Sequence, residues 1–250
     1  SGSDAYSLSA RAERQSGGYL LNGTKTFVTN APLADLTLVF ATVDRSQGMW
    51  GVTAFLIDRG TPGFRVGRDL DKLGLRTSPM AEVILEDCQL PESSRLGPEG
   101  AGAKIFNSSM EWERACILAS HLGAMERQLE ICVAYARQRQ QFGQAIGKFQ
   151  SVANRIVDMK LRLETARLLI YKVAWLKQQG KPAAQEAALA KLYLGEAFLQ
   201  SSLDAVRVHG GYGYMTEFEV ERDLRDAVGG TIYSGTSDIQ RAIVARLMGL

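Results

Sequence analysis

The chain has 250 residues, of which 46% are hydrophobic and 22% charged, so it holds enough apolar mass for one large core or two smaller ones. Its 29 basic and 27 acidic residues leave a net charge of +2, which argues against a nucleic-acid-binding surface. No run of 18 apolar residues occurs, so no membrane span is predicted, and the N-terminal stretch lacks the apolar core of a signal peptide. Three cysteines without a CxxC pair favour a reducing compartment, and two distant histidines give no basis for a metal site.

The first 97 residues are predicted to form strands. The run "GYLLNGTKTFVT" has Asn22-Gly23 between two β-prone segments, which is a strong signal for a hairpin. Further strands are predicted over residues 36–43, 51–58, 63–67 and 81–90, separated by Asp, Gly, Pro and Ser. This spacing predicts a compact antiparallel barrel or sandwich.

Residues 98–250 change to a helical period. Apolar residues from Leu118 to Ala136 and from Val152 to Val173 recur in steps of four and three, which predicts two long helices, the first of which also includes the segment "SMEWERAC". "QGKP" should end the second, a third is predicted from about Ala183 to Val208, and a short fourth should start near Ser237, capped by Thr236 or Ser237. The fold class is therefore α+β, a β domain over residues 1–97 followed by an antiparallel four-helix bundle over residues 98–250.

Two glycine-containing motifs follow predicted helix ends, and each has a structural and a chemical interpretation. In "RQRQQFGQ", Arg139 is either a favourable cation at a helix C-terminus or a clamp for a phosphate, with Phe142-Gly143 turning the chain. In "HGGYGY", Gly210 and Gly211 either cap the helix or let the backbone approach a planar or phosphate-bearing ligand.

Two further motifs contain polar residues next to apolar ones. In "SMEWERAC", Glu113 shares a helix face with Met110 and Ile117, which suits a general base, although a surface charge beside Arg114 is the simpler interpretation of this window. In "TIYSGTSDIQR", the Gly-Thr-Ser-Asp run caps a helix and also offers backbone N–H groups to an anion.

In this order and on this architecture, the motifs together resemble the acyl-CoA dehydrogenase flavoprotein family over essentially the whole chain. The resemblance is carried by "GSDA", "LNGTKTFVTNA", "DKLGLRTSPMAEVILEDCQLP", "RQQFG", "HGGYGYMTE" and "IYSGTSDIQR". It implies a middle β-barrel domain and a C-terminal four-helix bundle that hold FAD. The helical domain of about a hundred residues that usually begins the family is expected to be absent from this chain.

The resemblance also implies roles for particular residues. Phe27 and Thr29 would lie beside the flavin ring, and Ser3 at the edge of the flavin and acyl sites. The adenine dinucleotide part would be bound, usually from a neighbouring subunit, by Arg139, Phe142 and Gln150, and on its other side by the stretch from Arg207 to Gly211, Gly210 included. The flavin phosphates would meet Thr236, Ser237 and Asp238. Arg207 and Asp238 stand where the family commonly has glutamines, so backbone contacts are expected there more than side-chain contacts. The thioester groove would draw on Glu111, Arg114, Ser234 and Gly235.

The place of the catalytic base differs from the commonest family pattern. Many members carry their glutamate in "YEGT", and that place is Ser234 here, a poor base at neutral pH without an activating partner. A subset that includes isovaleryl-CoA dehydrogenase has its glutamate on the first bundle helix, and the matching residue is Glu113 in "MEWERAC". Helical periodicity and the resemblance therefore agree on Glu113 as the base.

The predicted function is FAD-dependent α,β-dehydrogenation of an acyl thioester to the trans-2-enoyl product. Glu113 would remove the α-proton, the flavin would take the β-hydride, and an electron-transfer flavoprotein would reoxidise it. A homotetramer or dimer in the cytoplasm, or in the mitochondrial matrix of a eukaryote, is expected, with no nucleic acid, metal or membrane span. Three alternatives stay open: a carrier-protein-tethered acyl or aminoacyl substrate, a flavin monooxygenase on the same fold, and a flavin-free interaction module.

Overall fold

The computed structural model describes residues 2–250, which divide into two compact units. The first comprises the residues up to Lys72 together with Arg76–Ser109, and the second comprises Leu73–Leu75 and Met110–Leu250. The division falls inside a helix, between Ser109 and Met110. The domain boundary predicted between residues 97 and 98 stays a prediction.

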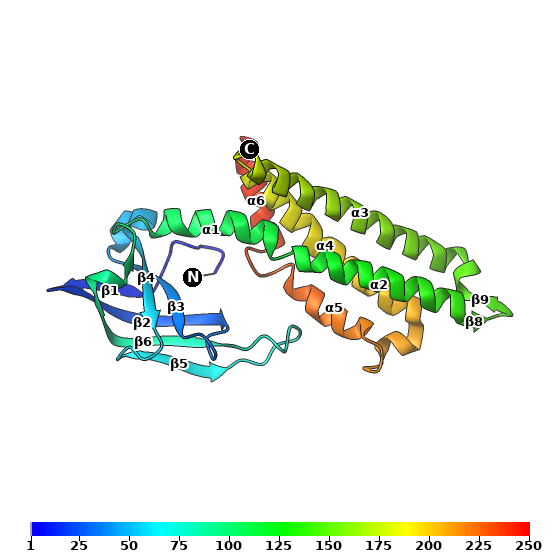
Figure 1. Cartoon of the computed structure of the whole chain (residues 1–250), viewed down its shortest axis with the longest axis horizontal. Helices are drawn as coiled ribbons and strands as arrows, with labels where there is room; N and C mark the ends of the chain where they lie inside the picture. Colours follow the sequence, from blue (N-terminus) through cyan, green and yellow to red (C-terminus); the bar gives the residue numbers. More distant parts are fainter. Residues whose placement is uncertain (1) are drawn as a thin grey trace. The chain divides into compact units, whose positions relative to one another are not determined.

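The first unit is built on a seven-stranded sheet (Figure 1). Its strands are β1 (Arg11–Gln15), β2 (Gly18–Thr29), β3 (Leu36–Thr42), β4 (Val52–Asp58), β5 (Phe64–Asp69), β6 (Met80–Pro91) and β7 (Arg95–Leu96). Their order is β5-β6-β2-β1-β3-β4-β7, and all pairs are antiparallel except a parallel β1–β3 contact. Short 3-10 helices cover Arg45–Gly51 and Glu92–Ser94. The four strands predicted after residue 35 are confirmed to within two residues at each end.

A closed barrel is not confirmed, because the order of strands in residues 2–250 has β5 and β7 as two edges. The core of this unit is formed by alternate residues of the strands, as expected for a sheet with one buried face. The buried set includes Leu21, Val39, Phe55, Ile57, Val83 and Leu85.

The hairpin predicted at Asn22-Gly23 is wrong. β2 runs unbroken through this dipeptide and pairs with β6, and the register shifts between Leu21 and Gly23, which marks a β-bulge. Gly23 has φ +139°, and a Cβ there would lie 2.7 Å from the Cα of Ala10, so glycine is required by the chain just before β1 and not by a turn. The turn between β1 and β2 is instead the two-residue loop Ser16-Gly17, with φ +86° at Gly17.

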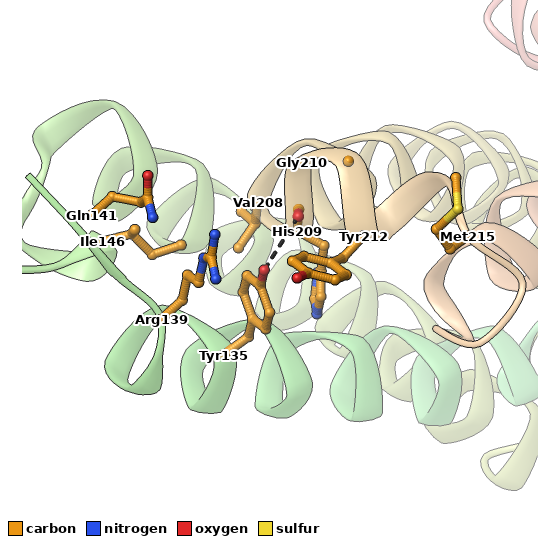
Figure 2. A pocket seen from close by; sticks show the side chains of 10 residues that line it. Tyr135, Arg139, Gln141, Ile146, Val208, His209, Gly210, Tyr212 and Met215 are labelled. Carbon is orange, nitrogen blue, oxygen red and sulfur yellow. Dashed lines mark hydrogen bonds between the residues drawn. The ribbon is translucent and has the colours of Figure 1, made fainter.

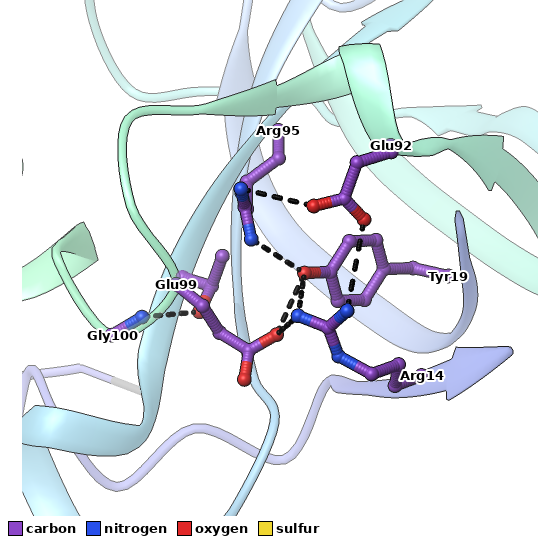
Figure 3. A network of polar contacts seen from close by, with 7 residues as sticks. Arg14, Tyr19, Glu92, Arg95, Glu99 and Gly100 are labelled. Carbon is purple, nitrogen blue, oxygen red and sulfur yellow. Dashed lines mark hydrogen bonds and ion pairs between the residues drawn. The ribbon is translucent and has the colours of Figure 1, made fainter. Parts of the chain in front are cut away.

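A polar network around Tyr19 ties β1 and β2 to the segment after β7 (Figure 3). The Tyr19 hydroxyl donates to Glu99 at 2.6 Å, Arg14 donates to the same carboxylate at 2.6 Å, and Arg95 donates to the Tyr19 oxygen at 3.0 Å. Arg95 also pairs with Glu92 at 2.9 Å. The Tyr19 bond, together with the Arg14 bond and charge, holds the pKa of Glu99 below its usual value.

The second unit is helical, which confirms the change of period. Its helices are α2 (Ala119–Gln138), α3 (Gln150–Gln178), α4 (Ala184–His209), α5 (Val220–Gly229) and α6 (Ser237–Leu247), and α1 (Gly102–Cys116) enters it at Met110. Figure 1 shows α2, α3 and α4 side by side, and α4 packs against α2, α3, α5 and α6. Two short strands, β8 (Gln140–Gln141) and β9 (Gln144–Ala145), and two 3-10 helices, Ile146–Lys148 and Gly210–Tyr214, complete it.

The first predicted long helix is two helices, since the chain leaves helical structure at Ile117 and Leu118. No Gly or Pro marks this break in the sequence, and Leu118 is fully buried, so tertiary packing decides it. The apolar stripes themselves are confirmed, because Met125, Leu129, Met159 and Leu163 lie in the core of this unit. α5 was not predicted.

Helix ends agree with the predicted caps. α3 ends at Gln178 with Gly180 at φ +66°, and the Lys181 N–H donates to the Leu176 carbonyl, as in a Schellman cap. α6 begins after Thr236, whose hydroxyl accepts the Ile239 N–H at 3.2 Å. Within residues 2–250, no helix is both long enough and apolar enough to cross a membrane, and no group of three His, Cys, Asp or Glu side chains could hold a metal ion.

Candidate active site

Glu113 and Ser234, which are 121 positions apart in the sequence, are in direct contact. Glu113 lies on the last turn of α1, and Ser234 lies in the loop before α6. The Ser234 hydroxyl donates to Glu113 Oε1 at 2.5 Å, and both side chains are partly buried. A hydrogen bond to a carboxylate is stronger than one between neutral groups. The structure thus brings together the two positions that the family resemblance associates with a catalytic base.

The segment around Ser234 has an unusual backbone. Ser234 has φ +56° and Gly235 has φ +91°, so two consecutive residues occupy the left-handed region. The buried Gln240 side chain donates to the carbonyl oxygens of both residues, at 3.2 and 3.0 Å. A Cβ on Gly235 would lie 2.6 Å from the Gln240 amide nitrogen, so glycine is required at this position.

Two buried titratable side chains fix the start of the same segment. Lys191, fully buried on α4, donates to the Gly230 carbonyl at 2.9 Å, and burial lowers its pKa to about 8. His121 on α2 has its Nε2 2.8 Å from the Tyr233 hydroxyl. Burial and then the Lys191 charge lower the pKa of His121 to about 4, while burial raises the pKa of Tyr233 to about 12. At neutral pH His121 and Tyr233 are therefore both uncharged.

The neighbours of Glu113 on α1 have structural contacts of their own. Glu111 pairs with Lys177 at the end of α3 and accepts the Ala183 N–H at 3.3 Å before α4. Arg114 is partly buried, and its charge contributes to the lowered pKa of Lys191. The proposed place of Glu111, Arg114 and Gly235 in a substrate groove stays a prediction.

A cavity of about 510 Å³ lies at the other end of α2, where α4 meets the 3-10 helix Gly210–Tyr214 (Figure 2). Figure 2 shows the side chains of Tyr135, Arg139 and Tyr212 turned toward one another, and the Arg139 guanidinium lies 5.5 Å from the centre of the Tyr212 ring. The cavity is lined by Tyr135, Arg139, Gln141, Ile146, Val208, His209, Gly210, Gly211, Tyr212 and Met215. The "RQQFG" and "HGGYG" motifs thus meet at one cavity.

The chemistry of this cavity fits part of a dinucleotide. A guanidinium next to aromatic rings can pair with a phosphate and stack on a base. Gly210 has φ +60° as the cap of α4, and a Cβ on Gly211 would meet nothing within 4 Å, so backbone is open to a ligand there. The cap interpretation is therefore confirmed for Gly210, and the close approach of a ligand to Gly211 stays a prediction.

Three other predicted cofactor residues lie near this region but do not line the cavity. Phe142 is 93% exposed, with φ +51° in the turn between β8 and β9, and its ring is 6.0 Å from that of Phe149. Gln150 is exposed at the first position of α3. Arg207 is exposed on α4 and pairs with the buried Asp204 at 3.4 Å.

The start of α6 offers fewer donors than a bare helix terminus. Thr236 uses its hydroxyl as the cap, and the Ser237 N–H donates to the Thr231 carbonyl at 3.0 Å. Among the described residues 2–250, the buried Ser237 hydroxyl has no hydrogen-bond partner, so it is a donor that a ligand could satisfy. Asp238 is exposed and pairs with Arg241 at 3.0 Å. Contact of these three residues with flavin phosphates stays a prediction.

The remaining predicted residues belong to the sheet unit. Phe27 is 71% exposed with φ +60°, at a second register shift in the pairing of β2 with β6. Thr29 is exposed at the end of β2, opposite Met80, and Ser3 is exposed before β1. An exposed aromatic ring on a bulge is available for stacking, which is the role predicted for Phe27.

Several residues of the site were not found from the sequence. Tyr135 and Tyr212 line the cavity, and His121, Lys191 and Gln240 hold the segment around Ser234. The lysine in the apolar run "ALAKLYLG" is a signal that could have been used, because a lysine on an apolar helix face is seldom buried without a specific partner. No local signal marks Gln240.

Comparisons with known proteins match both parts of the chain. The family models described as acyl-CoA dehydrogenase, middle domain and acyl-CoA dehydrogenase, C-terminal domain match residues 1–88 and 100–249. An L-prolyl-(peptidyl-carrier protein) dehydrogenase of Pseudomonas fluorescens is 49% identical over 250 residues, which is 100% of this chain and 66% of the relative. The chain spans a little under two thirds of the length of the curated relatives it matches.

Two solved structures have the same fold over the whole chain. A prolyl acyl carrier protein oxidase has 52% identity and a TM-score of 0.98, covering 100% of this chain and 66% of that one. A structure described as PigA with FAD and proline has 46% identity and a TM-score of 0.98, covering 100% and 65%.

Proposed function

Because the chain belongs to the acyl-CoA dehydrogenase family, we propose that the protein containing it is an FAD-dependent dehydrogenase that oxidises the α,β-bond of an acyl thioester, with Glu113 as the base. The observation that carries the proposal is the contact between Glu113 and Ser234, at the two positions where the family has its glutamate. A positioned carboxylate can act as a general base toward a bound substrate.

FAD is the proposed cofactor. The cavity with Arg139 and Tyr212 fits the adenine dinucleotide portion, and the buried, unpartnered Ser237 hydroxyl at the start of α6 fits a phosphate oxygen. Phe27 and Thr29 are proposed to lie against the flavin ring. Bound FAD supplies the acceptor for the β-hydride, while this chain's own residues bind it and orient the substrate.

The work of this chain in the reaction is proton removal. Glu113 is proposed to take the α-proton onto its carboxylate, and the backbone N–H groups near Ser234 and Gly235 are available to hydrogen-bond the thioester carbonyl, where negative charge develops. The uncharged His121–Tyr233 pair next to this segment adds no competing charge.

A carrier-protein-tethered substrate is the second candidate, and the names of some relatives support it. The printed names of two similar proteins refer to prolyl groups on carrier proteins, and PigA is described with bound proline. A five-membered amino acid ring on a pantetheine thioester has the α- and β-hydrogens that the reaction needs.

The test is an anaerobic titration of the full-length FAD-loaded protein with a panel of thioesters, following the flavin absorbance. The panel compares acyl-CoA esters with prolyl and acyl groups on a pantetheine-bearing carrier protein. Loss of flavin absorbance with at least one thioester is expected. The thioester that acts at the lowest concentration shows whether coenzyme A or a carrier protein bears the acyl group. Retention of full absorbance with every thioester, or a colourless protein that does not take up FAD, would overturn the proposal. Oxygen use that depends on reduced nicotinamide or reduced flavin would favour a monooxygenase.

The electron acceptor and the assembly are further parts of the proposal. An electron-transfer flavoprotein is the proposed acceptor, and the name oxidase on one relative makes molecular oxygen the comparison to run. We propose a homotetramer or dimer, supported by an exposed apolar face on α3 formed by Val157, Leu161, Leu168, Tyr171 and Trp175. Light scattering of the purified full-length protein measures the assembly directly, and a monomer would contradict it.

A further inference from the structure

Serine is a poor base at neutral pH, yet the structure holds Ser234 in a conformation that serine seldom adopts. Its φ of +56° is in the left-handed region, which costs free energy for a residue with a Cβ and persists only where the surroundings enforce it. The surroundings here are well defined: Gln240 binds the carbonyls of Ser234 and Gly235, and Lys191 binds that of Gly230. The place of the Ser234 hydroxyl is thus set by the fold.

The same anchors keep the segment from shifting sideways. A Cβ on Gly230 would lie 2.6 Å from the His121 ring, so this part of the chain is packed directly against α2. Tyr233, the residue before Ser234, is bonded to His121 at 2.8 Å. A segment fixed at both ends and strained in the middle is typical of a functional position.

Glu113 has less support from its own helix. It lies on the last turn of α1, which ends at Cys116 before the break at Ile117 and Leu118. Helix geometry fixes the Cα of Glu113 but leaves the rotamers of a three-torsion side chain open. The hydrogen bond from Ser234 to Oε1 at 2.5 Å removes that freedom.

We propose that Ser234 is a positioning residue for Glu113. Its hydroxyl holds Oε1, so the other carboxylate oxygen, Oε2, receives the α-proton, while the electron pair of the broken C–H bond stays with the substrate carbon. The proposal rests on the proposed role of Glu113 as base, and it gives the position where the family often has a glutamate a different task in this chain.

Ser234→Gly in the full-length FAD-loaded protein separates the hydroxyl from the backbone. Glycine adopts a positive φ without strain, so a purely structural role predicts normal activity. If the hydroxyl positions the base, the rate of flavin reduction should fall roughly 10- to 100-fold, because a misplacement of about 1 Å can cost that much. The substrate concentration for half-maximal rate should change little, and the thermal midpoint should stay within about 4 °C of the wild type.

Two variants complete the comparison. Ser234→Ala also lacks the hydroxyl, so its rate of flavin reduction should fall by the same factor as in Ser234→Gly. Its thermal midpoint should be lower than that of Ser234→Gly, because its Cβ keeps the backbone strain. Ser120→Ala removes an exposed serine hydroxyl at the start of α2 that donates to the Ile117 carbonyl three residues earlier, and this variant should reduce flavin at the wild-type rate. A wild-type rate in Ser234→Gly would overturn the proposal.

A second readout does not depend on turnover. The carboxylate stretching band of Glu113, assigned in the oxidised protein by its loss in Glu113→Gln, should shift in Ser234→Gly because the hydrogen bond is gone. An unshifted band would overturn the positioning role even if no thioester reduces the flavin, whereas failure of every thioester with a shifted band would overturn the proposed function alone.

Discussion

Replacing Glu113 with glutamine separates its chemical role from its structural one. Glutamine has nearly the same shape and keeps an oxygen that can accept the Ser234 hydrogen bond, which is 2.5 Å long in the structure. What is lost is the negative charge and with it the ability to take a proton.

The two effects have different sizes. A hydrogen bond to a charged group contributes about 1.5–3 kcal/mol and a neutral one about 0.5–1.5 kcal/mol, so the free energy of unfolding should fall by roughly 1 kcal/mol, or about 2–4 °C in the thermal midpoint. Loss of a general base should slow the proton transfer by about 10²- to 10⁴-fold, which corresponds to roughly 3–5 kcal/mol in the activation free energy. The kinetic effect should therefore be several times the effect on stability.

The assay is anaerobic stopped-flow measurement of flavin reduction by the preferred thioester, with FAD content and thermal midpoint measured on the same samples. Glu130→Gln is the matched control, because it removes an exposed carboxylate from the neighbouring helix α2. It should reduce flavin at the wild-type rate. Flavin reduction by Glu113→Gln at that same rate would remove Glu113 from the role of base and refute the reasoning above.

Three further predictions concern the surroundings of the site. The pKa of His121 is lowered from 6.5 to about 4 in the fold, so the unfolded chain takes up the proton first, and the free energy of unfolding falls as the pH is lowered from 6.5 to 4. In His121→Phe this fall, measured by urea unfolding, should be smaller. The same dependence of stability on pH in the variant and the wild type would show that His121 is not its source. Arg139→Lys keeps the charge but not the planar guanidinium over Tyr212, so the dissociation constant for FAD should rise roughly tenfold by fluorescence titration, and an unchanged constant would exclude the cavity as the dinucleotide site. Tyr19→Phe removes the donor to Glu99, so the free energy of unfolding should fall by about 1–2 kcal/mol with no change in flavin reduction, and equal stability would show that the network contributes nothing.

The elements that could be predicted are those that local patterns determine. Strands such as β4 and β6 and the long helix α3 follow from apolar periodicity, and the ends of α3 and α6 follow from cap residues. The errors arise where contacts between residues distant in the sequence determine the local structure. Asn22-Gly23 has the composition of a hairpin, but Ala10 lies against Gly23 and the dipeptide forms a bulge inside β2.

The candidate site shows the same division. Glu113 could be identified because a helix face and a family resemblance agree on it, and Arg139 because it ends a helix beside a glycine turn. The contact between Glu113 and Ser234 joins residues 121 positions apart, and the roles of Gln240 and Lys191 depend on which carbonyls the fold brings to them. Only the folded chain shows such partners, because the hydrogen bonds of a buried amide or lysine depend on which buried polar groups lie next to it in the fold.

The break after α1 connects the fold to the proposed chemistry. α1 ends at Cys116 and α2 begins at Ala119, so Glu113 lies on the last turn of a helix that is separate from the bundle helix α2. The proposed base is held by a segment that is anchored to α2 through the bond of the Tyr233 hydroxyl to His121, and to α4 and α6 through the bonds of Lys191 and Gln240 to its backbone carbonyls. A serine at position 234 fits this arrangement because it can hold a carboxylate that approaches from another helix, and a glutamate there would place two carboxylates in contact, which would disfavour ionisation of both.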